Sequence, residues 1–322
     1  MKQIDILKSR VKNSPFILIH LLTSKCNCRC KICDLWKNVD NYKSDLNKEE
    51  VFTLLDKASE AGIVYYTIVG GEPLIRDDLL EILKYAKQLK LTTSVITNGF
   101  YLKKKCNDII PFIDVLEVSL DSNDELHDKM RGVDGLLNRA IQGIKLCKNS
   151  KTKIIINCVL SKANYKKIFD LIELSKKLDV YISIQPIDLV EGYNDNLILE
   201  KKVIQKIYSE IIRYKKSGYK ISNSYSYLKL LSQNNKYICH APKSLIVVKP
   251  NGDITSCLNY EYYYDSWGNI KDKKLKEIFN SKSFKNFCKK VEKCNVCNGA
   301  CIIESSILYS LNPSLIFEKL IK

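Results

Sequence analysis

The segment FILIHLL (residues 16–22) runs directly into TSKCNCRCKIC (residues 23–33). The first segment is a nearly unbroken apolar run, which is typical of a strand buried on both faces. The second segment carries four cysteines within eight positions: Cys26, Cys28, Cys30 and Cys33. Outside the secretory compartments, clustered cysteines more often bind metal than pair with one another. The stretch therefore predicts a metal site where the first strand of a sheet ends.

The spacing of these cysteines leaves two ligand sets open. Cys26, Cys30 and Cys33 form the pattern C-x3-C-x2-C, which suits an iron–sulfur cluster held by thiolates. Three ligands from one loop leave one iron without a protein ligand, much as an open position marks a catalytic zinc site. In this set Cys28 is a small side chain tolerated within the loop. The alternative is a zinc site built from Cys28, Cys30, Cys33 and a remote ligand.

Further apolar, β-rich segments follow, and amphipathic helical patterns alternate with them. The expected strands are residues 64–70, 92–97, 115–120, 153–160 and 180–187, and the expected helices are residues 47–62, 77–90, 136–149 and 165–178. Asn47 and Asp77 are the expected N-caps of the first two helices. Apolar strands alternating with amphipathic helices predict a parallel sheet covered by helices. Six such units indicate a partial (β/α)6 barrel, with its chemistry at the carboxyl ends of the strands.

Short polar or glycine-containing motifs follow successive strands. They are the cysteine loop, GGEP (70–73), TNG (97–99), SLDS (119–122) and QPI (185–187). Each alone is ordinary turn chemistry. Because parallel strands end at the same rim, we expect all five motifs to converge on one site.

The composition indicates a folded protein with an excess of positive charge. The chain has 322 residues, is 45% hydrophobic, and has a formal net charge of +16. The lysines are spread along the chain without an arginine-rich block, so we expect a solvated surface and no nucleic-acid partner. No apolar run is long enough to span a membrane, and residues 1–16 lack the apolar core of a signal peptide. We therefore expect a cytoplasmic protein without a transmembrane segment.

The pattern changes after residue 190. Residues 197–219 predict a long amphipathic helix, residues 244–257 a hairpin about a Pro-Asn-Gly turn, and residues 273–291 a helix. The expected division is an N-terminal extension (1–15), a barrel core (16–190), a connecting helical segment (191–235), a cysteine-rich domain (236–311) and a tail (312–322). Three cysteines stand apart and are expected to be buried hydrophobic side chains: Cys106, Cys147 and Cys158.

The cysteine loop together with GGEP, TNG and SLDS resembles the radical S-adenosylmethionine enzymes over residues 14–190. The resemblance implies a [4Fe–4S] cluster held by Cys26, Cys30 and Cys33, whose open iron binds S-adenosylmethionine. It further implies reductive cleavage of that cofactor, a 5′-deoxyadenosyl radical that abstracts a substrate hydrogen, and a low-potential electron donor such as a flavodoxin or ferredoxin. The cofactor-binding residues carried over are Gly70, Gly71, Glu72, Pro73, Ser119, Asp121, Arg131 and Gln185. A purely structural role for Arg131 or Gln185 stays open, and Ile32 departs from the aromatic residue that many members carry before the last cysteine.

A second set of cysteines resembles the auxiliary-cluster region, called SPASM or twitch, that follows many such barrels. Its pattern is C-x12-G-x4-C followed by C-x2-C-x3-C. The resemblance implies one auxiliary [4Fe–4S] cluster, with Cys239, Cys257, Cys294 and Cys297 as preferred ligands and Cys301 as the rival for one place. Cys288 is expected to be a bystander on a helix. A zinc site made by the same cysteines is the alternative.

The expected function is a radical S-adenosylmethionine oxidoreductase that modifies a peptide or protein. The same chemistry on a sugar-like, phosphorylated or lipid-linked metabolite is the first alternative, and the short N-terminal extension, which holds no peptide-binding leader domain, keeps it open. A non-catalytic iron–sulfur scaffold or electron-transfer protein is the alternative from another class. No catalytic acid, base or hydrogen-donating cysteine is identified by the sequence.

Overall fold

The computed structural model describes residues 14–33, 35–37, 44–188, 194–257, 266–294 and 296–310. The N-terminal extension up to residue 13 and the tail from residue 311 lie outside these ranges. The strands form one eight-stranded sheet in the order β6-β5-β4-β3-β2-β1-β7-β8. They are β1 (Ile17–Leu21), β2 (Tyr65–Val69), β3 (Thr92–Thr97), β4 (Val115–Ser119), β5 (Lys153–Leu160), β6 (Tyr181–Pro186), β7 (Leu245–Val248) and β8 (Ile254–Thr255).

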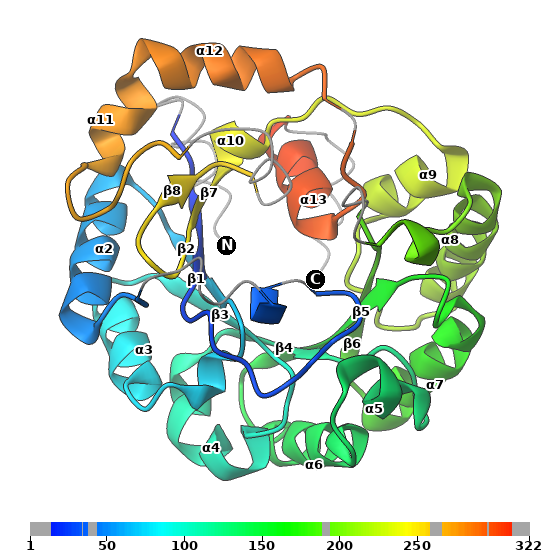
Figure 1. Cartoon of the computed structure of the whole chain (residues 1–322). Coiled ribbons are helices and arrows are strands. Elements are labelled where there is room, and N and C mark those ends of the chain that lie inside the picture. Colours follow the sequence, from blue (N-terminus) through cyan, green and yellow to red (C-terminus); the bar gives the residue numbers. More distant parts are fainter. Residues whose placement is uncertain are drawn as a thin grey trace.

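The first six strands are parallel and pair in chain order, so the chain builds the wall of a partial barrel one β/α unit at a time. Figure 1 shows the strands curving as an inner wall inside a ring of helices. The helices of this part are α2 (Lys48–Ala61), α3 (Leu79–Gln88), α4 (Leu102–Ile109), α5 (Leu126–Arg131), α6 (Leu136–Cys147) and α7 (Ile168–Leu178). The expected α/β partial barrel is confirmed.

The remaining helices belong to the connection and the cysteine-rich part. They are α8 (Lys201–Lys216), α9 (Tyr225–Gln233), α10 (Ala241–Ser244), α11 (Leu275–Asn280), α12 (Lys282–Val291) and α13 (Ala300–Tyr309). In Figure 1, α13 lies between the β7–β8 hairpin and α9, where the ring of strands is open. None of the helices in the described ranges combines the length and apolar character needed to cross a lipid bilayer.

The main core lies between the outward face of the sheet and the helices. Side chains such as Leu18, Tyr66, Leu116 and Ile156 alternate along their strands and are fully buried. The intervening residues point into the barrel. Since a strand's side chains alternate in direction, the six strands supply one face to the core and the other to an interior cavity.

The β7–β8 hairpin is present as expected, but its position was not predicted. β7 pairs in parallel with β1, with Ile17 opposite Leu245 and His20 opposite Val248. β8 then pairs antiparallel to β7. The cysteine-rich part is therefore joined to the barrel by main-chain hydrogen bonds and extends its sheet.

Two local expectations need correction. Asn47 caps α2 through a capping box with Glu50, but Asp77 does not cap α3, which begins after Asp78. The Asp78 carboxylate accepts from Arg76 Nε at 2.8 Å and makes no cap bond. The helix expected over residues 273–291 is two helices, because Ser281 is extended and its side chain accepts from Phe284 N to start α12.

The three isolated cysteines are buried as expected, yet two of them do not stand alone. Cys106 on α4 and Cys147 on α6 lie beside each other, with their Cα atoms 6.1 Å apart and their sulfurs bonded. They are 41 positions apart in sequence, and only the packing of α4 on α6 brings them together. Cys158 is a free, buried thiol on β5.

Candidate active site

A cavity of about 1390 Å³ occupies the interior of the barrel. Its wall consists of inward-facing strand residues, the cysteine loop and part of α13. It gathers most of the residues predicted for the site: Cys26, Cys30, Cys33, Gly70, Gly71, Ser119, Arg131, Gln185 and Cys301. Motifs from the ends of β1, β2, β3, β4 and β6 thus meet at one rim, as their positions after the strands predict.

The cysteine loop is held by main-chain hydrogen bonds to the end of α5. Arg29 N donates to Arg131 O at 2.9 Å, and Lys31 N donates to Met130 O at 3.0 Å. At the start of the loop, the Asp45 carboxylate accepts from Thr23 Oγ1 at 2.6 Å. Anchoring at both ends fixes where the loop places its sulfurs.

Gly70 and Gly71 let the β2 loop pass directly against the cysteine loop. Gly71 N donates to Thr23 O at 2.7 Å. A Cβ atom on Gly70 would lie 2.6 Å from Thr23 O, and one on Gly71 would lie 2.1 Å from Lys25 O. Gly70 also has φ +127°, a conformation that favours glycine. Both glycines are therefore required by close backbone approach.

Glu72 lies behind this contact and does not line the cavity. Its Oε1 accepts from Thr97 Oγ1 at 2.7 Å and from Leu74 N at 3.0 Å, and its Oε2 accepts from Asn98 N at 2.7 Å. Burial raises the pKa of this carboxyl, and these donors oppose the rise. The carboxylate joins the loops after β2 and β3, and Pro73 continues into a short 3-10 turn. Contact of Glu72 and Pro73 with S-adenosylmethionine stays a prediction.

The sulfurs of the loop differ in their electrostatic surroundings. Hydrogen bonds from the Cys28 thiol lower the pKa of Cys26 and, together with the nearby Arg131 guanidinium, lower that of Cys30 to about 6. The same bonds, with burial, raise the pKa of Cys28. Asn98 Nδ2 also donates to Cys28 Sγ at 3.2 Å. Cys26 and Cys30 thus have thiolate character that suits a metal ligand, whereas Cys28 stays a buried thiol.

Arg131 and Asp121 form a buried ion pair beside the loop. Arg131 Nε donates to Asp121 Oδ2 at 2.6 Å, and the carboxylate raises the pKa of the guanidinium against the effect of burial. The other oxygen, Asp121 Oδ1, is buried without a hydrogen-bond partner. Ser119 lies two residues earlier on the cavity wall. These polar groups provide donors and acceptors at the rim where the cofactor is expected.

Gln185 faces the cavity and also fastens the cysteine-rich part to the barrel. Its Oε1 accepts from Ala300 N at 2.7 Å, at the first residue of α13. Three residues further on, Asp188 Oδ1 accepts from Asn298 N. The end of β6 is therefore an anchoring point, a role that the sequence left open for Gln185.

The four preferred auxiliary ligands lie together. Cys239, Cys257 and Cys297 are buried in one apolar cluster with Ile302, and Cys294 packs against it. Cys301 instead is exposed to the barrel cavity, and its depth within the protein desolvates the thiol and raises its pKa to about 12. Cys288 is buried on α12, as expected of a bystander.

The donor sets fit iron–sulfur clusters. Both consist of cysteine sulfurs, and the loop sulfurs border open space. In the described ranges, no three His, Cys, Asp or Glu side chains converge to hold a single metal ion. A cluster binds its thiolates at separate corners, so its ligands need not converge on one point.

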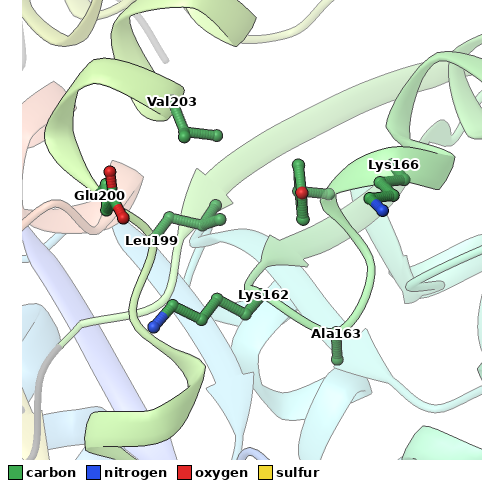
Figure 2. Close-up of a pocket in the computed structure, with 7 residues that line it drawn as sticks. Lys162, Ala163, Lys166, Leu199, Glu200 and Val203 are labelled. Carbon is green, nitrogen blue, oxygen red and sulfur yellow. The ribbon is translucent and has the colours of Figure 1, made fainter.

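A second hollow, of about 510 Å³, lies outside the barrel. Figure 2 shows it between the loop after β5, with Lys162 and Ala163, and the start of α8, with Glu200 and Val203. None of the predicted site residues lines it. Its wall combines lysine and aliphatic side chains with Tyr165 and Glu200.

Three residues near the site were not assigned by the sequence. Asp45 and Asn98 hold the cysteine loop, and Glu117 of β4 faces the cavity. A signal existed for Asn98 in the TNG motif and for Glu117, an acidic residue inside the apolar strand VLEVS. Asp45 offered none, because its partners lie about twenty residues earlier in the chain.

Residues 21–175 match the family model described as the radical SAM superfamily, and residues 239–301 match SPASM, described as an iron–sulfur cluster-binding domain. Fe-coproporphyrin III synthase of Methanosarcina barkeri is 22% identical over 92% of this chain and 86% of its own length. AdoMet-dependent heme synthase of the same organism is 31% identical, over 52% of this chain and 48% of its own length.

Among solved structures, SuiB of Streptococcus suis bound to the precursor peptide SuiA superimposes with a TM-score of 0.71. The alignment covers 94% of this chain and 76% of that protein, at 19% sequence identity. At this identity the likeness concerns the fold. The shared fold extends over both the barrel and the cysteine-rich part.

Proposed function

Because this chain belongs to the radical S-adenosylmethionine superfamily and carries a SPASM iron–sulfur domain, we propose that it oxidises a side chain of a peptide or protein. As a member of this superfamily, the chain is an enzyme that uses S-adenosylmethionine with a [4Fe–4S] cluster, and its SPASM domain holds an auxiliary iron–sulfur cluster. The observation that carries the proposal is the single cavity shared by the cysteine loop, the two glycines and α13.

Cys26, Cys30 and Cys33 would hold the first cluster. When bound, it supplies the electron that cleaves S-adenosylmethionine and so provides the 5′-deoxyadenosyl radical. Arg131 beside Cys30 offsets the negative charge of the thiolates. Gly70 and Gly71 bring main-chain groups to the rim without a side chain in the way, and Ser119 presents a hydroxyl there. These groups would orient the methionyl and ribose parts of the cofactor.

Cys239, Cys257, Cys294 and Cys297 would hold one auxiliary [4Fe–4S] cluster. Because these cysteines lie against β7, which pairs with β1, this cluster would lie beside the barrel wall. It would accept the electron left on the substrate or help to position the substrate. We propose a barrel core over residues 16–190, a connection over 191–235 and the auxiliary domain over 236–311.

Two observations bear on the substrate. SuiB, which shares the fold, was solved with a precursor peptide, and this favours a peptide or protein. The synthases of Fe-coproporphyrin III and heme, which share sequence, keep a small metabolite as the second candidate. A flavodoxin or ferredoxin is the proposed electron donor.

The proposal is tested by incubating the anaerobically reconstituted, reduced chain with S-adenosylmethionine. We expect release of 5′-deoxyadenosine, and we expect Cys30→Ala to abolish it. The control is Cys288→Ala, which removes a buried thiol on α12 away from the loop. If well-reconstituted protein releases no 5′-deoxyadenosine even with candidate peptides present, the alternative of an iron–sulfur scaffold or electron-transfer protein is favoured.

A further inference from the structure

Glu117 is a carboxylate on the wall of the barrel cavity with an apolar neighbour on each adjacent strand. It faces the cavity from β4, two residues before Ser119 on the same face of the strand. Its neighbour in register on β3 is Ile96, and its neighbour on β5 is Ile155. Neither neighbour offers a hydrogen bond through its side chain. A charged group at this level of the wall needs a partner from elsewhere.

The described part of the chain provides a hydrogen-bond donor to only one of the two carboxylate oxygens of Glu117. Asn157 Nδ2 donates to Glu117 Oε2 at 2.9 Å. The other carboxylate oxygen of Glu117 accepts no hydrogen bond within the described part of the chain. Asn157 Oδ1 is buried and also lacks a hydrogen-bond partner. Glu117 therefore has a carboxylate oxygen, and the adjacent Asn157 a buried amide oxygen, that no donor in the described part of the chain satisfies.

The other carboxylates that line the cavity already have partners. Asp114 accepts from Lys87 Nζ at 2.7 Å, and Glu304 accepts from Ser224 N at 2.8 Å. Lining cations are likewise engaged: Arg131 with Asp121 at 2.6 Å, Lys215 with Asn223 O, and Lys153 over the Tyr181 ring at 4.0 Å from its centroid. Within the described residues, Glu117 forms no ion pair. Its charge is therefore available to a ligand.

Burial raises the pKa of Glu117 to about 7, while Asn157 and the more distant Lys153 oppose the rise. The carboxylate form is thus costly without a cation nearby. A ligand that brings positive charge and N–H donors would offset this cost and satisfy both open acceptors.

We propose that Glu117 and Asn157 form a substrate-binding subsite for a cationic amine or guanidinium group. The proposal rests on the proposed function only in taking the barrel cavity as the substrate site. It narrows the substrate class to molecules with a basic group, such as a peptide with a lysine or arginine side chain. It argues against placing a phosphate or carboxylate group of the substrate at this depth of the cavity.

The test uses two fluorescent probes that differ only in charge. N-dansyl-1,5-diaminopentane carries a terminal ammonium, and N-dansylpentylamine lacks it. Their dissociation constants are measured from dansyl fluorescence with the reconstituted, oxidised full chain at about pH 8, where Glu117 is ionised. Because no S-adenosylmethionine is cleaved under these conditions, the result is independent of the proposed activity.

We expect the wild-type chain to bind the ammonium probe about tenfold or more tightly than the neutral probe. Glu117→Gln should remove most of this preference. Glu304→Gln is the matched control, since that carboxylate lines the same cavity but already accepts from a backbone N–H, and it should keep the preference. Equal binding of both probes by wild type, or loss of the preference in Glu304→Gln alone, overturns the proposal.

A second measurement keeps the test valid if Glu117→Gln does not fold. In the wild-type chain, the preference for the ammonium probe should fall as the pH is lowered through about 7, because protonated Glu117 has no charge. The other titratable groups facing it are Tyr65 of β2, Lys153 of β5 and Cys301 of α13. The pKa values of Tyr65 and Cys301 are raised to about 12, so neither changes charge in this range. A preference that stays constant down to about pH 5.5 contradicts the proposal.

Discussion

At the scale of single residues, the four sulfurs of the cysteine loop differ in their burial and in the groups around them. Cys28 is buried, donates to its neighbours and accepts from Asn98. Cys26 and Cys33 are only half-buried, and Cys30 lies beside Arg131. The C-x3-C-x2-C spacing and these surroundings agree in leaving Cys28 outside the proposed ligand set.

Replacement of Cys28 should therefore be mild. We expect Cys28→Ala to retain the iron content and the cleavage of S-adenosylmethionine, with a stability loss of about 1 kcal/mol from the lost hydrogen bonds. Cys26→Ala, Cys30→Ala and Cys33→Ala should each lose the loop cluster and the activity. Iron and acid-labile sulfide are measured on anaerobically purified protein. If Cys28→Ala is as damaging as the other three, the ligand register is wrong.

A glycine of the β2 loop should be equally indispensable. A Cβ on Gly71 would lie 2.1 Å from Lys25 O, and neither backbone segment has room to retreat without breaking the bond from Gly71 N to Thr23 O. We expect Gly71→Ala to displace the cysteine loop and to reduce loop-cluster iron and 5′-deoxyadenosine formation by at least about tenfold.

Gly62→Ala is the matched control for this prediction. Gly62 has φ +89° at the end of α2, and a Cβ there meets nothing within 4 Å. This control should cost about 1 kcal/mol of stability through its backbone conformation and leave the cluster intact. Equal iron content in the two variants would show that the close contact is not needed.

At the scale of elements, the starts of α2 and α12 each depend on one capping side chain. The Asn47 side chain accepts a hydrogen bond from Glu50 N, and the Glu50 carboxylate accepts one from Asn47 N. Ser281 in the same way begins α12 and divides what the sequence pattern indicated as one helix. Apolar periodicity alone continues across Ser281, so the break was not predicted.

The contribution of the Asn47 cap can be measured as a change in stability, without an activity assay. We expect Asn47→Ala to lower the free energy of unfolding by about 1 kcal/mol, because Glu50 N at the start of α2 loses its side-chain acceptor. The check is the midpoint of urea unfolding, followed by circular dichroism. Asp77→Ala is the control, since the Asp77 side chain is exposed and its ion pair with Lys105, at 3.6 Å, lies at the protein surface. A larger loss for Asp77→Ala would contradict the assigned caps.

At the scale of the whole molecule, the auxiliary region closes against both edges of the partial barrel. β7 extends the sheet beyond β1, and α13 is tied to the end of β6 by Gln185. This arrangement places Cys301 on the cavity wall, while the four preferred auxiliary ligands, Cys239, Cys257, Cys294 and Cys297, lie together outside it.

The separation predicts different outcomes for two neighbouring cysteines. Cys297→Ser should lower the iron content from roughly eight to roughly four atoms per chain, because one of two [4Fe–4S] clusters is lost. Cys301→Ser should keep roughly eight. Iron, sulfide and zinc are measured on reconstituted protein. If Cys301→Ser loses iron and Cys297→Ser retains it, Cys301 is the ligand in place of Cys297. If the protein contains zinc instead of iron, the alternative of a zinc site is supported.

The sequence by itself determined the architecture and most of the site. Alternating strands and helices predict the parallel barrel, and motif positions after the strands predict the rim at which Cys30, Gly71 and Arg131 meet. These features are local in the chain, so period and spacing reveal them. Only the tertiary structure decided that β7 pairs with β1, that Gln185 anchors α13, and that Glu117 lies beside Asn157 with no ion pair to any described residue. Those outcomes depend on contacts between distant segments, and no local pattern encodes which segments will pack together.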